Sequence, residues 1–187
     1  MRIISGNFKG KKILIPKDKA TRPLKDITKE SIFNIIKHSN KFDIEINDSR
    51  VLDLFSGIGS FGLECLSRGS SYLAFVENYK EVLPILKKNI SNLNYQNISQ
   101  VIEKDIFNNL DFKSLKKKFD IIFIDPPYKE KNLPILLSKI IKSDILKRGG
   151  IFIIHRHKKE KDEFPIKFNI IEQKTYGISK IIFGNCI

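Results

Sequence analysis

Short apolar runs recur along the chain, with room for a helix between successive runs. Five of them, rich in Ile, Val and Phe, predict buried strands: residues 51–55, 72–76, 98–102, 119–124 and 151–154. The intervening segments have helical patterns, namely the residues after a glycine-rich turn to about 67, then 78–90, 107–115 and 132–146. Strands that alternate with helices predict a parallel sheet with crossover connections.

The two ends of the chain add to this alternating core. Stretches 168–172 and 178–183 flank Tyr176-Gly177 and predict an antiparallel hairpin at one sheet edge, which makes seven strands. At the front, residues 2–5 and 11–15 predict a small hairpin, and 28–38 a helix. We expect one α/β domain over residues 1–187, with an N-terminal extension (1–42) and a Rossmann-like core (43–187).

Two helix boundaries depend on single residues. Asn78 and Glu81 form a possible capping pair at the start of the second helix, but Pro84 would remove a hydrogen bond inside it. Gly149-Gly150 is expected to end the last helix.

Composition fits a folded domain and excludes several classes of protein. Hydrophobic residues make up 41% and charged residues 29% of the 187 residues, and no apolar run reaches the roughly 20 residues of a membrane span. The first residues lack a signal-peptide pattern, so we expect a cytoplasmic protein. Cys65 and Cys186 cannot form a disulfide framework or a zinc site by themselves.

Positive charge gathers at the front of the chain. The net charge is +13, and residues 1–41 hold 11 basic and three acidic residues, or +8. Such a surplus favours a polyanionic partner, and Lys9, Lys11, Lys12 and Arg22 are the candidate RNA contacts. The alternative is a lysine-rich surface with no specific partner.

A glycine-rich turn follows the first core strand. Gly57, Gly59 and Gly62 fit the pattern G-x-G-x-x-G, in which glycines allow a tight turn and close approach of a ligand. Glu77 ends the next strand, 20 residues after Gly57, where its carboxylate could accept hydrogen bonds from ribose hydroxyls. The arrangement predicts a cofactor that contains a nucleoside.

Two aspartates refine the choice of cofactor. Asp53, four residues before Gly57, would repel a pyrophosphate but attract the ammonium and sulfonium of S-adenosylmethionine. Alternatively, Asp53 only accepts hydrogen bonds from amides of the loop. Asp105 follows the third strand and could accept the adenine amino group, or simply cap the next helix.

The fourth strand ends in Asp125-Pro126-Pro127-Tyr128, the candidate catalytic residues. The two prolines fix the backbone and have no amide hydrogens, so carbonyl acceptors stand beside an acidic side chain. An exocyclic amino group could donate to the Asp125 carboxylate and the Pro126 carbonyl while its base stacks on Tyr128. The alternative is an ordinary rigid turn.

The order of these motifs, with Arg2-Ile3-Ile4-Ser5-Gly6, Arg22-Pro23 and Tyr176-Gly177, resembles the bacterial RsmD family of methyltransferases over nearly the whole chain. The resemblance implies a seven-stranded methyltransferase sheet with an antiparallel last strand, S-adenosylmethionine as the donor, and the N2 amino group of a guanine in 16S ribosomal RNA as the acceptor. It implies that the methionine end of the donor lies against Asp53, Gly57 and Gly59, the ribose against Glu77 and the adenine against Asp105, with Phe55 and Ile106 also in the cofactor site. It places the guanine against Asp125 to Tyr128.

Some residues depart from the family pattern. Leu24 and Ile27 stand where the family tends to have Thr and a basic residue, and His155 replaces an acidic residue. The pair His155 and His157 could hold a metal, but two histidines without a third ligand are interpreted here as surface residues at a strand end.

Other functions remain open at this stage. A DNA adenine or protein glutamine amino-methyltransferase would use the same D-P-P-Y chemistry, although the compact basic extension favours RNA. A noncatalytic RNA-binding module is a further alternative, which the acids at Asp53, Glu77 and Asp125 disfavour. We expect a monomer that acts on ribosomal RNA or on the assembled small subunit.

Overall fold

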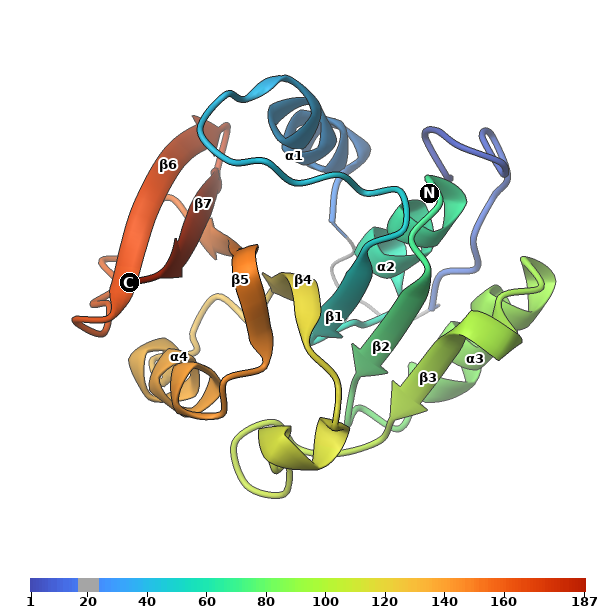
Figure 1. Ribbon diagram of the computed structural model, residues 1–187. Helices are drawn as coiled ribbons and strands as arrows, with labels where there is room; N and C mark the ends of the chain where they lie inside the picture. Colours follow the sequence, from blue (N-terminus) through green and yellow to red (C-terminus); the bar gives the residue numbers. More distant parts are fainter. Residues whose placement is uncertain (17–23) are drawn as a thin grey trace.

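The computed structural model describes residues 1–16 and 24–187 and contains one seven-stranded sheet (Figure 1). The strands are β1 (Arg50–Leu54), β2 (Tyr72–Val76), β3 (Ser99–Ile102), β4 (Phe119–Ile124), β5 (Leu146–His157), β6 (Phe168–Tyr176) and β7 (Ser179–Cys186). Their order is β3-β2-β1-β4-β5-β7-β6, with β1 to β5 parallel and β7 antiparallel to both neighbours. The predicted α/β class and antiparallel last strand are confirmed.

Helices cover both faces of this sheet. They are α1 (Asp26–His38), α2 (Ser60–Ser67), α3 (Leu83–Asn92) and α4 (Leu133–Lys142), with short 3-10 turns η1 (Gln96–Ile98) and η2 (Phe112–Leu115). The first three helices pack on one face of the sheet, and α4 and η2 on the other. Both faces are therefore buried, as a parallel sheet requires. Within the described residues, no helix combines the length and apolar content needed to cross a membrane.

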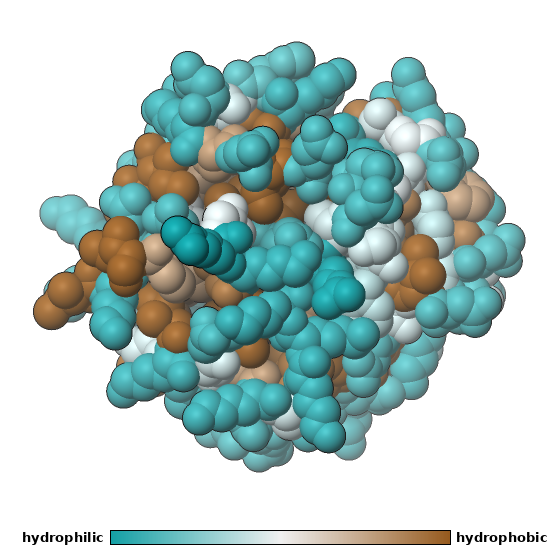
Figure 2. Space-filling model, viewed as in Figure 1, coloured by the Kyte–Doolittle hydropathy of each residue, from teal (hydrophilic) through white to brown (hydrophobic). Residues whose placement is uncertain are grey.

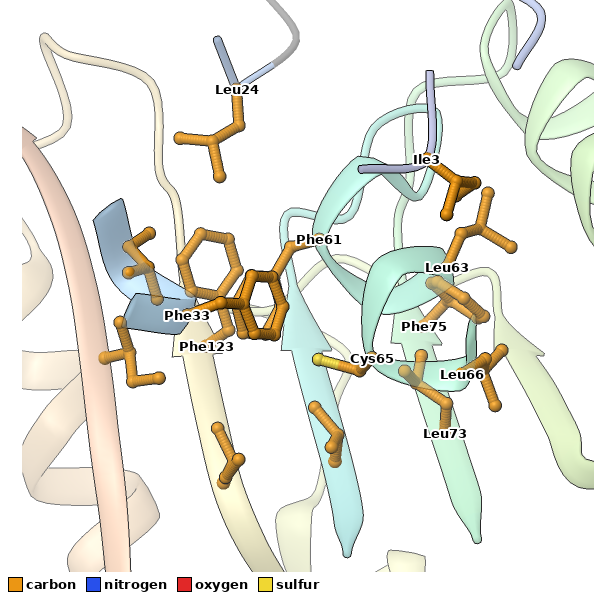
Figure 3. Close-up of a cluster of buried hydrophobic side chains, with 14 of the residues drawn as sticks. Ile3, Leu24, Phe33, Phe61, Leu63, Cys65, Leu66, Leu73, Phe75 and Phe123 are labelled. Atoms are coloured by element: carbon orange, nitrogen blue, oxygen red, sulfur yellow. The ribbon is translucent and has the colours of Figure 1, made fainter. Parts of the chain in front are cut away.

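An aromatic stack joins the N-terminal extension to the core. Phe33 of α1 stacks on Phe61 of α2 with ring centroids 5.3 Å apart, and Phe61 stacks on Phe123 of β4 at 3.9 Å (Figure 3). All three rings are buried. Because Phe61 opens the helix after the glycine turn, burial of these rings fixes the turn against the sheet.

A buried ion pair makes a second junction. The Lys29 ammonium of α1 lies 3.5 Å from the Glu64 carboxylate of α2, and both side chains are 0% exposed. Glu64 also accepts the backbone N–H groups of Ile4 and Ser5, at 2.7 and 2.9 Å. Burial lowers the pKa of Lys29, against the attraction of Glu64 and Asp26. The extension is therefore part of the same packed body as the core.

Two predicted helices were wrong in part. Residues 107–115 form no α-helix and contain only the short 3-10 turn η2. The Asp105 carboxylate accepts the N–H groups of Phe107 and Asn108, and the Asp111 carboxylate accepts that of Lys113. Such local hydrogen bonds compete with those of a helix. The last helix ends at Lys142 instead of residue 146. Gly149-Gly150 does not end it and lies inside β5, where the pairing with β4 is irregular.

Two further boundaries also differ from expectation. The helix expected from residue 78 begins at Leu83, since Pro84 fits only the first turn, where no amide hydrogen is needed. The N-terminal hairpin is reduced to a single bridge between Arg2 and Lys12. Three backbone hydrogen bonds still join its two arms, such as the 2.9 Å bond from Ile3 N–H to the Lys11 carbonyl, and the Asn7 N–H donates to the Ser67 carbonyl of the core at 2.8 Å.

Candidate active site

The glycine turn between β1 and α2 contains three left-handed residues, Phe55, Gly57 and Gly59, with φ of 62°, 53° and 83°. A side chain at Gly59 would also be too close to its neighbours, since a Cβ would lie 2.7 Å from the Leu86 Cδ1 atom. The left-handed backbone therefore favours glycine there, and any side chain would also displace Leu86. The turn lies at the carboxyl ends of the parallel strands, where ligands of this architecture bind.

Glu77, directly after β2, closes one side of this turn. Its Oε2 atom accepts the Gly57 N–H at 2.7 Å, and Oε1 accepts the N–H groups of Asn78 and Tyr79, both at 2.8 Å. The carboxylate is partly exposed. It thus connects the loops that follow β1 and β2 and remains reachable from solvent.

Asp53 lies beneath the turn and is 1% exposed. Its Oδ2 atom accepts the Gly62 N–H at 3.1 Å, so the capping contact considered as an alternative is present. Burial raises the pKa of Asp53 well above its usual value, and the nearby carboxylates of Asp125 and Glu77 raise it further, while the Gly62 N–H opposes the shift. A cation placed beside Asp53 would favour its ionised form.

Asp105 follows β3 at the same edge of the sheet. One carboxylate oxygen caps the two following amides, and the other accepts the Asn78 side-chain amide at 3.2 Å. Asn78 therefore connects Asp105 with the loop that carries Glu77. The neighbouring Ile106 is buried, and the Phe55 ring lies 6.0 Å from that of Phe107.

The D-P-P-Y segment follows β4, the neighbour of β1. The Asp125 N–H donates to the Leu54 carbonyl at 3.3 Å, which joins this segment to the start of the glycine turn. The Asp125 side chain is 21% exposed, Pro126 is buried and Tyr128 is half-buried. The structure therefore brings Asp53, Glu77 and Asp125 to one edge of the sheet.

His157 is half-buried, but the interpretation of His155 as a surface residue was wrong, and its neighbour Arg156 lies in the same strand pairing. His155 and Arg156 are both buried, because β5 continues to His157 and pairs there with β7. The Arg156 guanidinium donates to the Pro127 carbonyl at 3.4 Å and the Glu130 carbonyl at 2.8 Å, and pairs with Asp162 at 2.8 Å. The sequence did not reveal these contacts of Arg156, because the predicted strand 151–154 stops before it. A strand predicted to reach residue 157 would have placed Arg156 inside the sheet.

The side chains of the candidate RNA contacts Lys9, Lys11 and Lys12 are exposed, and Arg22 lies outside the described residues. The Lys11 ammonium donates to the Asn92 carbonyl at 2.6 Å, so it is less available than Lys9 and Lys12 for contact with an RNA phosphate. Of the departures from the family pattern in the N-terminal extension, Leu24 is 4% exposed and packs in the core. Ile27 is 71% exposed.

Hydrophilic side chains cover much of the face seen in Figure 2, and apolar side chains form smaller separate groups. This distribution fits a chain in which 29% of the residues are charged. Lys29, which is buried against Glu64, adds nothing to the exposed charge of the extension.

The comparisons with known proteins agree with this geometry. YlbH of Bacillus subtilis is 35% identical over 184 residues, which cover 97% of this chain and 96% of that protein. Ribosomal RNA small subunit methyltransferase D of Buchnera aphidicola is 32% identical, with 92% and 86% of the two chains covered. The solved structure of yhhF from Escherichia coli has the same fold, with a TM-score of 0.80, 22% identity, and 98% and 96% of the two chains covered.

The fold and these relatives define a Rossmann-like methyltransferase. The family model described as "Conserved hypothetical protein 95" matches residues 1–185. The chain belongs to this family, which is the RsmD family, and the resemblance in its motifs is confirmed.

Proposed function

We propose that this protein transfers a methyl group from S-adenosylmethionine to the N2 amino group of a guanine in 16S ribosomal RNA, and that it works in the cytoplasm as a monomer. The observation that carries the proposal is the meeting of Asp53, Glu77 and Asp125 at the carboxyl edge of strands β1, β2 and β4. The name of the Buchnera aphidicola relative, ribosomal RNA small subunit methyltransferase D, supports 16S ribosomal RNA as the substrate.

The residues around the glycine turn suit the donor. The Asp53 carboxylate would face the ammonium of its methionine part, and Glu77 would accept hydrogen bonds from the ribose hydroxyls. Asp105 and Ile106 would border the adenine, and Phe55 would lie beside the turn. When bound, S-adenosylmethionine supplies an electrophilic methyl group on a sulfonium.

The D-P-P-Y segment suits the acceptor. A guanine N2 amine is a poor nucleophile, since its lone pair is delocalised into the ring. The Asp125 carboxylate and the Pro126 carbonyl would hold the amine and stabilise the positive charge that develops on it, while Tyr128 stacks on the base. The target guanine must therefore be unpaired or flipped out of a helix.

The direct test is transfer of labelled methyl to small subunits from cells that lack this protein, followed by mapping of methylguanine in the 16S RNA. Label in a single guanine N2 position supports the proposal. Label in DNA or in a protein glutamine would instead support the other amino-methylation chemistries. Absence of transfer by protein that binds the donor would indicate a noncatalytic module.

We expect removal of two exposed charges, Lys9→Ala with Lys12→Ala, to weaken binding to substrate particles and to flatten its salt dependence. Each lost phosphate contact reduces the slope of log affinity against log salt by about 0.7 to 0.9. The measurement is particle affinity between low and high salt. The pair Lys113→Ala and Lys142→Ala removes equal charge from the opposite face of the sheet and serves as control. If both pairs behave alike, the extension has no special role.

Glu77→Ala should weaken donor binding about tenfold or more, because a charged hydrogen-bond partner is worth roughly 1.5 to 3 kcal/mol. Calorimetry with S-adenosylmethionine measures this, and Glu172→Ala on β6 controls for loss of a carboxylate. Thermal unfolding must accompany it, since Glu77 also holds three backbone amides. Undiminished affinity in a folded variant would reject the ribose role.

A further inference from the structure

His155 lies directly behind the proposed base-binding carboxylate. Its Nδ1 atom is 2.7 Å from the Asp125 Oδ1 atom, and its Nε2 atom is 2.9 Å from the Ser179 hydroxyl oxygen. The imidazole is 7% exposed, so both contacts are largely shielded from water. A chain of hydrogen bonds thus runs from β7 through β5 to the residue that follows β4.

The partners of the ring determine the direction of these bonds. A carboxylate can only accept, so Nδ1 must carry the hydrogen that faces Asp125. In the neutral ring, Nε2 then accepts the hydroxyl hydrogen of Ser179. The Asp125 carboxylate therefore sets the tautomer, and the Ser179 hydroxyl of β7 complements it by donating to Nε2 and holding the ring in place.

The same imidazole also borders the other recognition element of the loop. The Tyr128 ring packs edge-on against His155, with centroids 6.0 Å apart, and against His157 at 5.2 Å. His155 consequently contacts both groups proposed to hold the guanine, the carboxylate and the stacking ring. Arg156, on the opposite face of β5, holds the carbonyls of Pro127 and Glu130.

We propose that His155 is a positioning residue for base recognition, which holds Oδ1 of Asp125 so that Oδ2 is presented to the exocyclic amine. This inference rests on the proposed role of Asp125 as acceptor. A carboxylate that could rotate freely would have to be ordered anew in each transition state, whereas a held carboxylate is already oriented. The effect of His155 should thus fall on the transfer step.

Two amide substitutions at position 155 separate positioning from packing. The amide nitrogen of Asn is bonded to Cγ, as Nδ1 of His is, so His155→Asn can still donate to Asp125. The amide nitrogen of Gln lies one bond further out, like Nε2, so His155→Gln reaches Ser179 instead. We expect His155→Gln to lower the single-turnover rate about tenfold, and His155→Asn to retain most of the rate.

Donor affinity and thermal midpoint are measured on the same samples, and we expect similar values in both variants. Equal rates in the two variants, or a near-wild-type rate in His155→Gln, would overturn the inference. Ser179→Ala, which keeps the imidazole and a small buried side chain, should lower the rate a few-fold. An unchanged rate there would contradict the role of Ser179 in holding the His155 ring.

Asp125→Ala in the same series separates failure of this inference from failure of the proposed function. If the single-turnover rate falls in Asp125→Ala but stays near wild type in His155→Gln, only the positioning role of His155 is overturned. A near-wild-type rate in Asp125→Ala would contradict the proposed role of Asp125 as the hydrogen-bond acceptor of the amine. His155 would then have no carboxylate to position for the reaction.

Discussion

Replacing Asp125 by Ala is expected to lower the rate of methyl transfer on the order of 100-fold or more, while donor affinity changes only a few-fold. The carboxylate lies at the end of β4, is held by His155 and is 21% exposed, so it can meet a base from outside. Its interaction with the amine strengthens as positive charge develops on the nitrogen, and this stabilises the transition state more than the bound substrate. Single-turnover transfer and donor binding, measured side by side, test this expectation.

Asp125→Asn is the matched variant. The amide keeps one acceptor oxygen, so we expect partial activity and a smaller loss than in Asp125→Ala. Because the His155 hydrogen also needs an acceptor, the Asn oxygen cannot serve both His155 and the base equally well. A near-wild-type transfer rate in folded Asp125→Ala would contradict the proposed chemistry.

Glu64→Ala is expected to destabilise the protein by about 3 to 5 kcal/mol. The substitution leaves the buried Lys29 ammonium without its main partner and removes the acceptor of the Ile4 and Ser5 amides. Unpaired charge in a low-dielectric interior is costly, and the pKa of Lys29, already lowered by burial, would fall further. Urea unfolding gives the change in free energy.

The control is an exposed ion pair. Lys87 and Glu103 lie 2.6 Å apart with side chains 53% and 47% exposed, so Glu103→Ala should change stability by about 0 to 1 kcal/mol. Similar losses in the two variants would mean that burial of the Lys29–Glu64 pair has no special weight. A loss in Glu64→Ala that salt abolishes would lead to the same conclusion, because buried pairs are poorly screened.

The alternation of apolar runs predicted most of the sheet. Strands β2 and β4 have the predicted bounds, since short apolar runs rich in β-branched and aromatic residues have few other interpretations. The prediction was weaker where local side-chain bonds decide the backbone, as around Asp105 and Asp111. Those bonds depend on rotamers that a hydrophobic pattern does not encode.

The candidate site likewise has residues that the sequence could place and residues that only the folded structure places. Asp53, Glu77, Asp105 and Asp125 could be placed at one edge because each follows or ends a parallel strand. The buried roles of His155 and Arg156 could not, because they depend on how far β5 extends beside β7, a long-range pairing. Likewise, Lys29 counted as surface charge in the sequence, and only the packing of α1 on α2 pairs it with Glu64.

The placement of Ser179 and Lys180 has a consequence for fragments of this protein. Ser179 holds the His155 ring, and the Lys180 ammonium lies 3.3 Å from the Asp162 carboxylate that pairs with Arg156. A chain shortened before β6 would keep every residue of the proposed donor site and lose the support of the base-binding loop. The two parts of the proposed reaction thus depend on different regions of the chain: binding of the nucleoside on the loops after β1, β2 and β3, and orientation of the target base on the C-terminal strand β7.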